Sequence, residues 1–278
     1  MTNSKIINHG VILGRKKSDW VAGTIPYEIR NPSGDWTPYL VRTEKQWFPT
    51  LDTQACVSFS ANNVSEIQVK QQTGVEVNFS DRFLAKMSGT THQGNWLYIV
   101  GDTLRKIGGV LEEEWPVPPE PFDWNDYYSP IPQFIQDRAK PQFLDKYTIQ
   151  TEFIGISITE IEKHLKHAPL QIVIPGHAVA GIVIKIAGGV ITYFDTYEPY
   201  LKTTTVNQLS DVYKILLTIK NMSNATFVHK TGTGEYGFYL PALTPDALKD
   251  KALNLGKEEI IKLDGTIDFT KAKEVTFN

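Results

Sequence analysis

The sequence predicts an α+β protein in which a helical half comes before a β-rich half. Apolar residues recur at helical spacing from Cys56 to about residue 71, with no glycine or proline before Gly74. In the second half, short apolar runs at residues 170–174, 178–186 and 190–194 predict successive strands. A proline-rich stretch, residues 115–132, separates the two patterns. It is expected to cross between the halves as an extended chain, the alternative being a surface loop.

Bulk composition excludes several classes of protein. The chain has 278 residues, of which 41% are hydrophobic and 21% charged, values typical of a soluble globular protein. A net charge of −3 gives no general attraction to nucleic acid. No apolar run is long enough to span a membrane, and residues 1–19 lack the apolar core of a signal peptide. The chain has one cysteine, so it forms no internal disulfide, which is consistent with a reducing compartment.

Further elements follow from capping residues and periodicity. The predicted helices cover residues 80–87, with Ser80 as N-cap, and residues 94–107, 157–167 and 206–219. Further strands are predicted at residues 225–230 and 236–240. The tail, residues 244–278, has Thr244-Pro245 as a helix start and Asp264-Gly265 as a hairpin turn.

Cys56 is the candidate nucleophile, because it opens the predicted helix that follows Asp52-Thr53. Unpaired N–H groups and the dipole at a helix start lower the pKa of a thiol, and the thiolate is the reactive form. We expect Cys56 to be half exposed at this helix end. The alternative is a buried cysteine that acts as a small hydrophobic residue.

His177 and Asp195 lie on neighbouring predicted strands joined by a turn at Gly188-Gly189. Such a pair places the two side chains next to each other, so the carboxylate can accept a hydrogen bond from the imidazole and select its tautomer. The alternative for His177 is a core histidine with its hydrogen bonds satisfied.

Residues 53–61, Thr-Gln-Ala-Cys-Val-Ser-Phe-Ser-Ala, surround the candidate nucleophile. They resemble the nucleophile segment of the papain-like cysteine peptidases, and the order of several further segments is similar to that of this family. Gln93-Gly94-Asn95-Trp96 is similar to its glycine-containing substrate strip. Residues 176–181, Gly-His-Ala-Val-Ala-Gly, resemble the family's histidine motif, and residues 188–197 resemble the segment with its orienting asparagine. The resemblance covers roughly residues 40–200.

This resemblance implies a papain-like fold in which the nucleophile helix packs against an antiparallel sheet or barrel. It also implies a catalytic triad of Cys56, His177 and Asp195, with Gly94 at the substrate strip. The family's oxyanion glutamine lies six residues before its cysteine, where this chain has Thr50; Gln46 takes that role if the loop is four residues longer. Val57 replaces the family's tryptophan, and Asp195 replaces its asparagine.

The expected function is hydrolysis of an amide in a peptide or in peptidoglycan, without metal or cofactor. The alternative is an inactive papain-like scaffold with a structural or binding role, for example in a phage virion. The expected organisation is an N-terminal extension over residues 1–40, a papain-like domain over 41–243 and a tail over 244–278. Within the domain, the helical half covers about 50–135 and the β half about 136–243. We expect a bacterial or phage-encoded protein, cytoplasmic or virion-associated, whose tail binds a protein partner.

Overall fold

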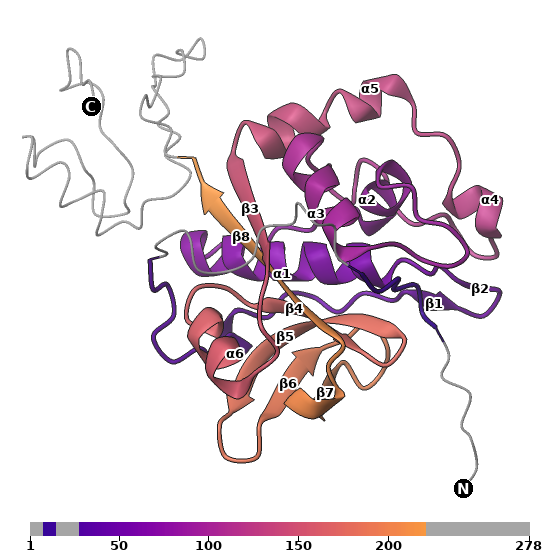
Figure 1. Cartoon of the computed structure of the whole chain (residues 1–278). Helices are drawn as coiled ribbons and strands as arrows, with labels where there is room; N and C mark the ends of the chain where they lie inside the picture. The colour runs from indigo at the N-terminus through magenta and orange to yellow at the C-terminus, as the bar shows by residue number, and fades with distance from the viewer. Residues whose placement is uncertain (1–7, 15–27, 221–278) are drawn as a thin grey trace, which may run out of the picture. The chain divides into compact units, whose positions relative to one another are not determined.

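A computed structural model describes residues 8–14 and 28–220, and the fold concerns these residues. The chain divides into two compact units, and the first, Met1–Gln71 with Val75–Ile219, contains both halves described below. It combines helices with a six-stranded antiparallel sheet, which confirms the predicted α+β class (Figure 1). The strands predicted at residues 225–230 and 236–240, and the tail from residue 244, lie outside the described residues.

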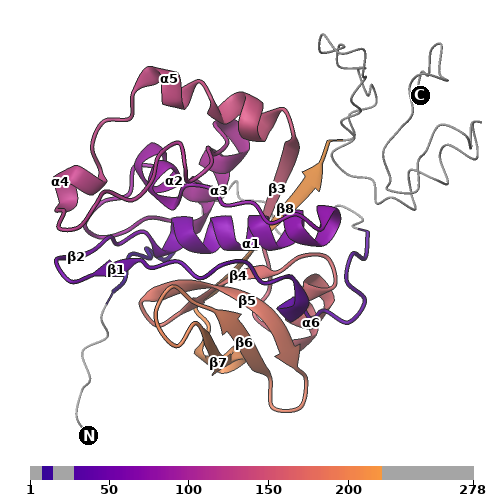
Figure 2. The same ribbon diagram turned by 180° about the vertical axis from the view of Figure 1, so that it is seen from behind.

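Helix α1 is the centre of the unit. It spans Cys56–Thr73 and follows a hairpin of two short strands, β1 (Trp47–Phe48) and β2 (Leu51–Asp52). Figures 1 and 2 show helices α2 and α3 on one side of α1 and strands β4 to β7 on the other. The remaining helices have the following bounds: α2 Asp81–Met87, α3 Leu97–Lys106, α4 Trp124–Tyr127, α5 Gln133–Gln136 and α6 Ile158–Leu165.

Because α1 is covered on both sides, its polar residues are buried as well as its apolar ones. Buried polar groups need hydrogen-bond partners, and two side chains of α1 find them in different halves of the unit. Asn62 donates to Asp81 of α2 at 2.8 Å. Gln68 donates to the carbonyl of Ile215 at 2.9 Å and accepts from the N–H of Leu217 at 3.0 Å. These bonds fix the helix in the position that places Cys56.

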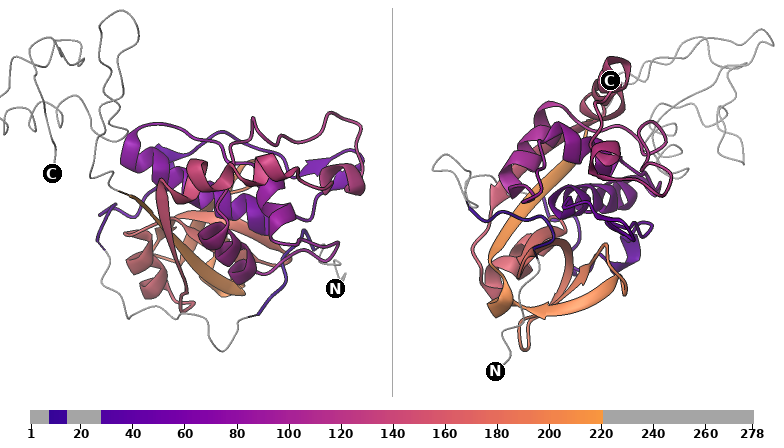
Figure 3. Two further views of the ribbon diagram at one scale, coloured as in Figure 1. Left: turned by 90° about the horizontal axis from the view of Figure 1, so that it is seen from above. Right: turned by 90° about the vertical axis from the view of Figure 1, so that its right-hand side faces the viewer.

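The sheet has the order β3-β8-β4-β5-β6-β7, with every neighbouring pair antiparallel. Figure 3 shows it beside α1 from two further directions. The hairpin β4–β5 turns directly before His177, and the hairpin β6–β7 contains Asp195 in its turn. The strand bounds are β3 Tyr147–Phe153, β4 Leu170–Ile174, β5 His177–Lys185, β6 Val190–Phe194, β7 Leu201–Thr205 and β8 Asp211–Ile219.

The helix predicted over residues 206–219 is wrong. A short 3₁₀ turn, Val206–Gln208, is followed by β8, which pairs with β3 on one side and β4 on the other. A strand covered on both faces has a continuous run of apolar residues. The spacing of apolar residues does not distinguish such a strand from a buried helix. Lys214 lies in the middle of β8, fully buried, and its ammonium pairs with Glu152 directly opposite on β3.

The proline-rich crossing is only partly extended. Helix α4 interrupts it, opened by a capping box in which the side chains of Asp123 and Asp126 each accept the other's backbone N–H. The predicted helix over residues 157–167 is confirmed as α6, with Ser157 accepting the N–H of Glu160. Ser80 caps α2 in the same way, through the N–H of Phe83.

Candidate active site

Cys56 is the first residue of α1, but it is not half exposed as the sequence suggested. It is 0% exposed, and its Sγ accepts a hydrogen bond from the N–H of Ala178 at 3.4 Å. Burial raises the pKa of the Cys56 thiol, and the charges of Asp52 and Asp195 add to the effect. Desolvation therefore opposes the effect of the helix start and favours the neutral thiol over the thiolate in this arrangement.

His177 and Asp195 come together as the strand argument predicts. His177 begins β5, and Asp195 follows the last residue of β6. The ring Nε2 lies 2.7 Å from Asp195 Oδ1, and both side chains are buried. A carboxylate at this distance holds the proton on Nε2 and leaves the lone pair on Nδ1. That Nδ1 is buried and has no hydrogen-bond partner among the described residues.

Asp195 is an ionised acceptor with four donors. Its Oδ1 accepts the N–H groups of Thr196 at 2.7 Å and Tyr197 at 3.3 Å in addition to His177. Its Oδ2 accepts from the ammonium of Lys202 on β7 at 2.8 Å. Burial works to raise the pKa of Asp195, but the bonds and charges of His177 and Lys202 outweigh it and lower the pKa.

Gln46, the expected oxyanion residue, lies in the same neighbourhood and is fully buried. Its Oε1 accepts from the hydroxyl of Thr196 at 3.3 Å, which links it to the residue after Asp195. Its Nε2 donates to the carbonyl of His9 at 2.7 Å and to Asp52 Oδ1 at 3.1 Å. The β1–β2 hairpin lies between Gln46 and Cys56 along the chain.

Residues 8–12, here called the N-terminal segment, run past these groups. The sequence did not predict this contact. The N–H of His9 donates to the carbonyl of Gly176, directly before His177, at 2.7 Å. Further along, Asn95 donates its N–H to the carbonyl of Gly10 at 2.9 Å and accepts the N–H of Ile12 at 2.8 Å, which forms a parallel bridge. The segment is therefore held by main-chain bonds, as an added strand is.

Two glycines allow this close approach. A Cβ on Gly10, whose φ is +110°, would lie 2.0 Å from the carbonyl oxygen of Gln54. A Cβ on Gly94, the predicted substrate-strip residue, would lie 2.0 Å from the carbonyl of Gly10. Both distances are far below van der Waals contact, so each position requires glycine. Gly94 thus contacts a peptide backbone, although here that backbone belongs to the same chain.

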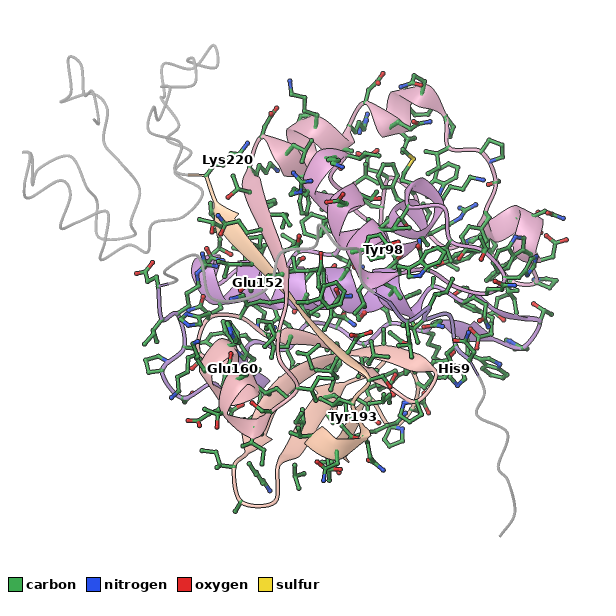
Figure 4. All side chains as sticks on the ribbon, in the orientation of Figure 1. His9, Tyr98, Glu152, Glu160, Tyr193 and Lys220 are labelled. Atoms are coloured by element: carbon green, nitrogen blue, oxygen red, sulfur yellow. The ribbon has the colours of Figure 1, made fainter. Side chains whose placement is uncertain are left out.

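The ring of His9 forms a second polar cluster beside the triad. Its Nδ1 lies 3.0 Å from Asp52 Oδ2 and 3.0 Å from the hydroxyl of Tyr197, which itself donates to Asp52 at 2.7 Å. The His9 and His177 rings meet edge to face, with centroids 5.2 Å apart. Figure 4 shows His9 on the same side of the molecule as β1 and β2. The Asp52 and Tyr197 contacts thus hold His9 next to the catalytic candidates.

Other kinds of site are not apparent in the described ranges 8–14 and 28–220. Within them, no three His, Cys, Asp or Glu side chains are grouped to hold a metal ion. None of the helices described there is long and apolar enough to cross a membrane. A cavity of about 380 Å³ lies between α2 and α4, and none of its lining residues is a predicted site residue.

The fold is that of the papain-like cysteine proteases. The structure matches Xylellain, a cysteine protease from Xylella fastidiosa, with a TM-score of 0.60 and 14% identity over 76% of this chain and 97% of that one. Procathepsin L 3 from the larval midgut of Tenebrio molitor matches with a TM-score of 0.53 and 13% identity, over 76% and 77% of the two chains. The Carica candamarcensis cysteine protease CMS1MS2 matches with a TM-score of 0.51 and 14% identity, over 66% and 96%. No protein-family model and no curated protein sequence matches the chain.

Proposed function

We propose that this chain is a papain-like thiol hydrolase that cleaves an amide bond in a peptide. The observation that supports it most directly is the state of His177. Asp195 holds Nε2 at 2.7 Å, Nδ1 is buried without a hydrogen-bond partner in the described part of the chain, and the next residue, Ala178, contacts Cys56 Sγ at 3.4 Å. A base with one nitrogen oriented and the other unoccupied beside a thiol has the arrangement that nucleophilic catalysis needs.

In the proposed reaction, Nδ1 of His177 takes the proton of Cys56, and the sulfur attacks the carbonyl carbon of the scissile amide. The carbonyl oxygen becomes an oxyanion, which accepts a hydrogen bond from Gln46 Nε2. The imidazolium then protonates the amine nitrogen, the C–N bond breaks, and a thioester remains on Cys56. Water, deprotonated by His177, hydrolyses the thioester and restores the thiol.

Gln46 is suited to this role because its Nε2 already donates to a carbonyl oxygen, that of His9, at 2.7 Å. The Gly176 carbonyl and the Asn95 main chain likewise bind an extended backbone. These groups bind main-chain atoms and do not distinguish side chains, so they suit a peptide main chain as substrate. Peptidoglycan cross-links, which are also amides between amino acids, are the narrower alternative substrate.

The N-terminal segment occupies this peptide path in our proposal. It contacts Gln46 and Gln54, which precede Cys56, and Gly176, which precedes His177, and Cys56 is fully buried. The described arrangement is therefore the closed form of the enzyme. A substrate enters only when the segment has left.

Thiol modification tests the proposal, because the chain has one cysteine and whole-protein mass therefore reports Cys56. In Gly10→Ala, a variant expected to displace the segment that covers Cys56, we expect a peptide aldehyde and iodoacetamide to modify Cys56 faster than the same thiol in urea-unfolded protein. We also expect the rate to depend on pH below the ordinary thiol range, and His177→Ala to remove both features.

A fluorogenic peptide library then measures hydrolysis, with Cys56→Ala as the blank. The proposal fails if Cys56 in the opened variant reacts no faster than a free thiol and His177→Ala changes nothing. Such a result would favour the second candidate function, a binding or structural protein on a papain-like scaffold. The complete burial of Cys56 and the raised pKa of its thiol are the observations that favour that alternative.

The tail, residues 244–278, is the expected contact for a protein partner. Bacterial or phage origin and a cytoplasmic or virion-associated location rest on the sequence argument alone. Truncation near residue 242 should disturb assembly with such a partner and leave the reaction of Cys56 with a thiol probe unchanged.

A further inference from the structure

Lys202 has a place in the site that the resemblance does not assign. It lies on β7 opposite Tyr193 of β6, so the strand register sets its position next to the turn that contains Asp195. That turn is closed by the N–H of Asp195, which donates to the carbonyl of Tyr200 at 2.8 Å. The ammonium reaches back over the turn and lies 2.8 Å from Asp195 Oδ2. The ring of Tyr197 is 6.0 Å from the same nitrogen and adds a weak cation–π contact.

The two oxygens of Asp195 therefore face two different partners. Oδ1 binds the His177 ring at 2.7 Å, and Oδ2 binds Lys202 at 2.8 Å. The carboxylate is 3% exposed, so solvent screens neither interaction strongly at that end, while the lysine side chain is 26% exposed. An isolated buried carboxylate would favour the imidazolium over the neutral imidazole, and a cation on its other oxygen opposes that preference.

We propose that Lys202 is a positioning residue that cancels the charge of Asp195, so that His177 meets a fixed hydrogen-bond acceptor of nearly zero net charge. The Asp195–Lys202 pair then orients the His177 ring as a neutral amide would, without holding that ring permanently in its protonated form. This inference rests on the proposed function, in which His177 must accept a proton and give it up in each cycle. A base that kept its proton could not deprotonate Cys56 or water.

The ionisable groups around His177 come from each element packed against it. The N-terminal segment contributes His9, the hairpin before α1 contributes Asp52, and α1 contributes Cys56. The β6–β7 turn and β7 contribute Asp195, Tyr197 and Lys202. Of these groups, Lys202 is the cation bound to Asp195, the hydrogen-bond partner of His177. Replacing Lys202 therefore tests the effect of one positive charge on the His177 ring.

The test is an NMR titration of the imidazole C–H signals in the full chain, with six histidines and with His177→Gln to assign the signal. Lys202→Met should move the titration midpoint of the His177 ring to higher pH by about one unit, because the carboxylate is no longer compensated. Lys202→Arg keeps the charge and should leave the midpoint within a few tenths of a unit. Asp195→Asn with Lys202→Met restores a neutral acceptor and should return the midpoint close to that of the unchanged protein.

A lysine that only supported the turn would lower the urea midpoint of Lys202→Met without moving the titration of His177, and that outcome would overturn the inference. The proposed function is tested separately by the pH profile of Cys56 modification. If His177→Ala leaves that profile unchanged, the hydrolase proposal fails, whereas the titration still decides the role of Lys202. If the profile depends on His177, its alkaline limb should move in Lys202→Met in the same direction as the NMR midpoint.

Discussion

Cys56 combines a position at a helix start with complete burial of its side chain. A helix start favours a thiolate, but full burial raises the pKa of the thiol. A half-exposed Cys56, as expected from the sequence, could be replaced by alanine with little loss of stability, but the side chain is fully buried. We expect the substitution to lower the free energy of unfolding by about 1 kcal/mol, because one buried atom leaves a small cavity.

Urea unfolding of Cys56→Ala and the unchanged protein, monitored by tryptophan fluorescence, measures this difference. Hydrolysis of any peptide substrate should disappear in the same variant. Cys56→Ser nearly conserves the volume and serves as the matched control for packing. A loss of several kcal/mol in Cys56→Ala would show instead that the thiol is a central element of the core.

Among single residues, Cys56, His177 and Asp195 stand in local motifs, so the sequence could nominate them as candidate site residues. The sequence points to Gln46 only if an insertion before Cys56 is assumed, because no short motif encodes the length of the β1–β2 hairpin. Lys202 could not be recognised, because a lysine on a short strand has the pattern of an ordinary solvent-facing residue. Only the register with β6 places it on Asp195.

At the scale of elements, the N-terminal segment is the feature that controls access to the thiol in our proposal. Gly10→Ala should displace it, because the new Cβ would lie 2.0 Å from the carbonyl oxygen of Gln54 and φ is +110°. We expect Cys56 in this variant to react with iodoacetamide at least about tenfold faster, which corresponds to about 1.4 kcal/mol of lost docking.

Gly14→Ala is the matched control for this prediction. Gly14 also has a positive φ, +138°, but no atom lies within 4 Å of its added Cβ. It therefore tests backbone strain without a clash against the site. Equal rates for Gly10→Ala and the unchanged protein, with both variants folded, would show that the segment does not cover Cys56.

Periodicity identified the amphipathic helix α6 but mistook strand β8 for a helix. The amphipathic helix α6 has a clear apolar face, and its predicted range agrees within two residues at each end. Strand β8 is buried on both faces through most of its length, so its apolar run resembled a helix. The docking of the N-terminal segment on Asn95 joins positions far apart in sequence, and no local pattern encodes such pairing.

At the scale of the whole molecule, buried carboxyl groups make stability depend on pH. Burial raises the pKa of Glu112 to about 7, and it raises the pKa values of Glu66 and Asp81 well above their ordinary range. Each group binds its proton more tightly in the folded state than in the unfolded state. Its contribution to stability is therefore fully present below the unfolded pKa and is lost as pH rises through the folded pKa.

Glu112→Gln tests this linkage in the window from about pH 4.5 to about 7. Glutamine does not titrate and keeps an oxygen for the N–H of Val117, which Glu112 accepts at 2.9 Å. We expect the variant to be more stable than the unchanged protein by about 2 kcal/mol at pH 8 and nearly equal to it at pH 4.

Urea unfolding at both pH values measures the difference, with Glu113→Gln at an exposed neighbouring position as the control. A change that is the same at pH 4 and pH 8 would show that Glu112 does not titrate differently on folding. Part of the pH dependence should persist in Glu112→Gln, because Glu66 and Asp81 shift in the same direction.

The main-chain bonds of residues 8–12 to Gly176 and Asn95 also have a consequence for measured affinities. A competitor on the same chain is not diluted when the protein is diluted, so its occupancy stays constant at every enzyme concentration. If about 1% of molecules are open, the apparent dissociation constant of every peptide is raised about a hundredfold over its intrinsic value. A ranking of peptides would then stay the same while all their affinities appeared weak. Anything that holds the segment away would strengthen all of them by one common factor.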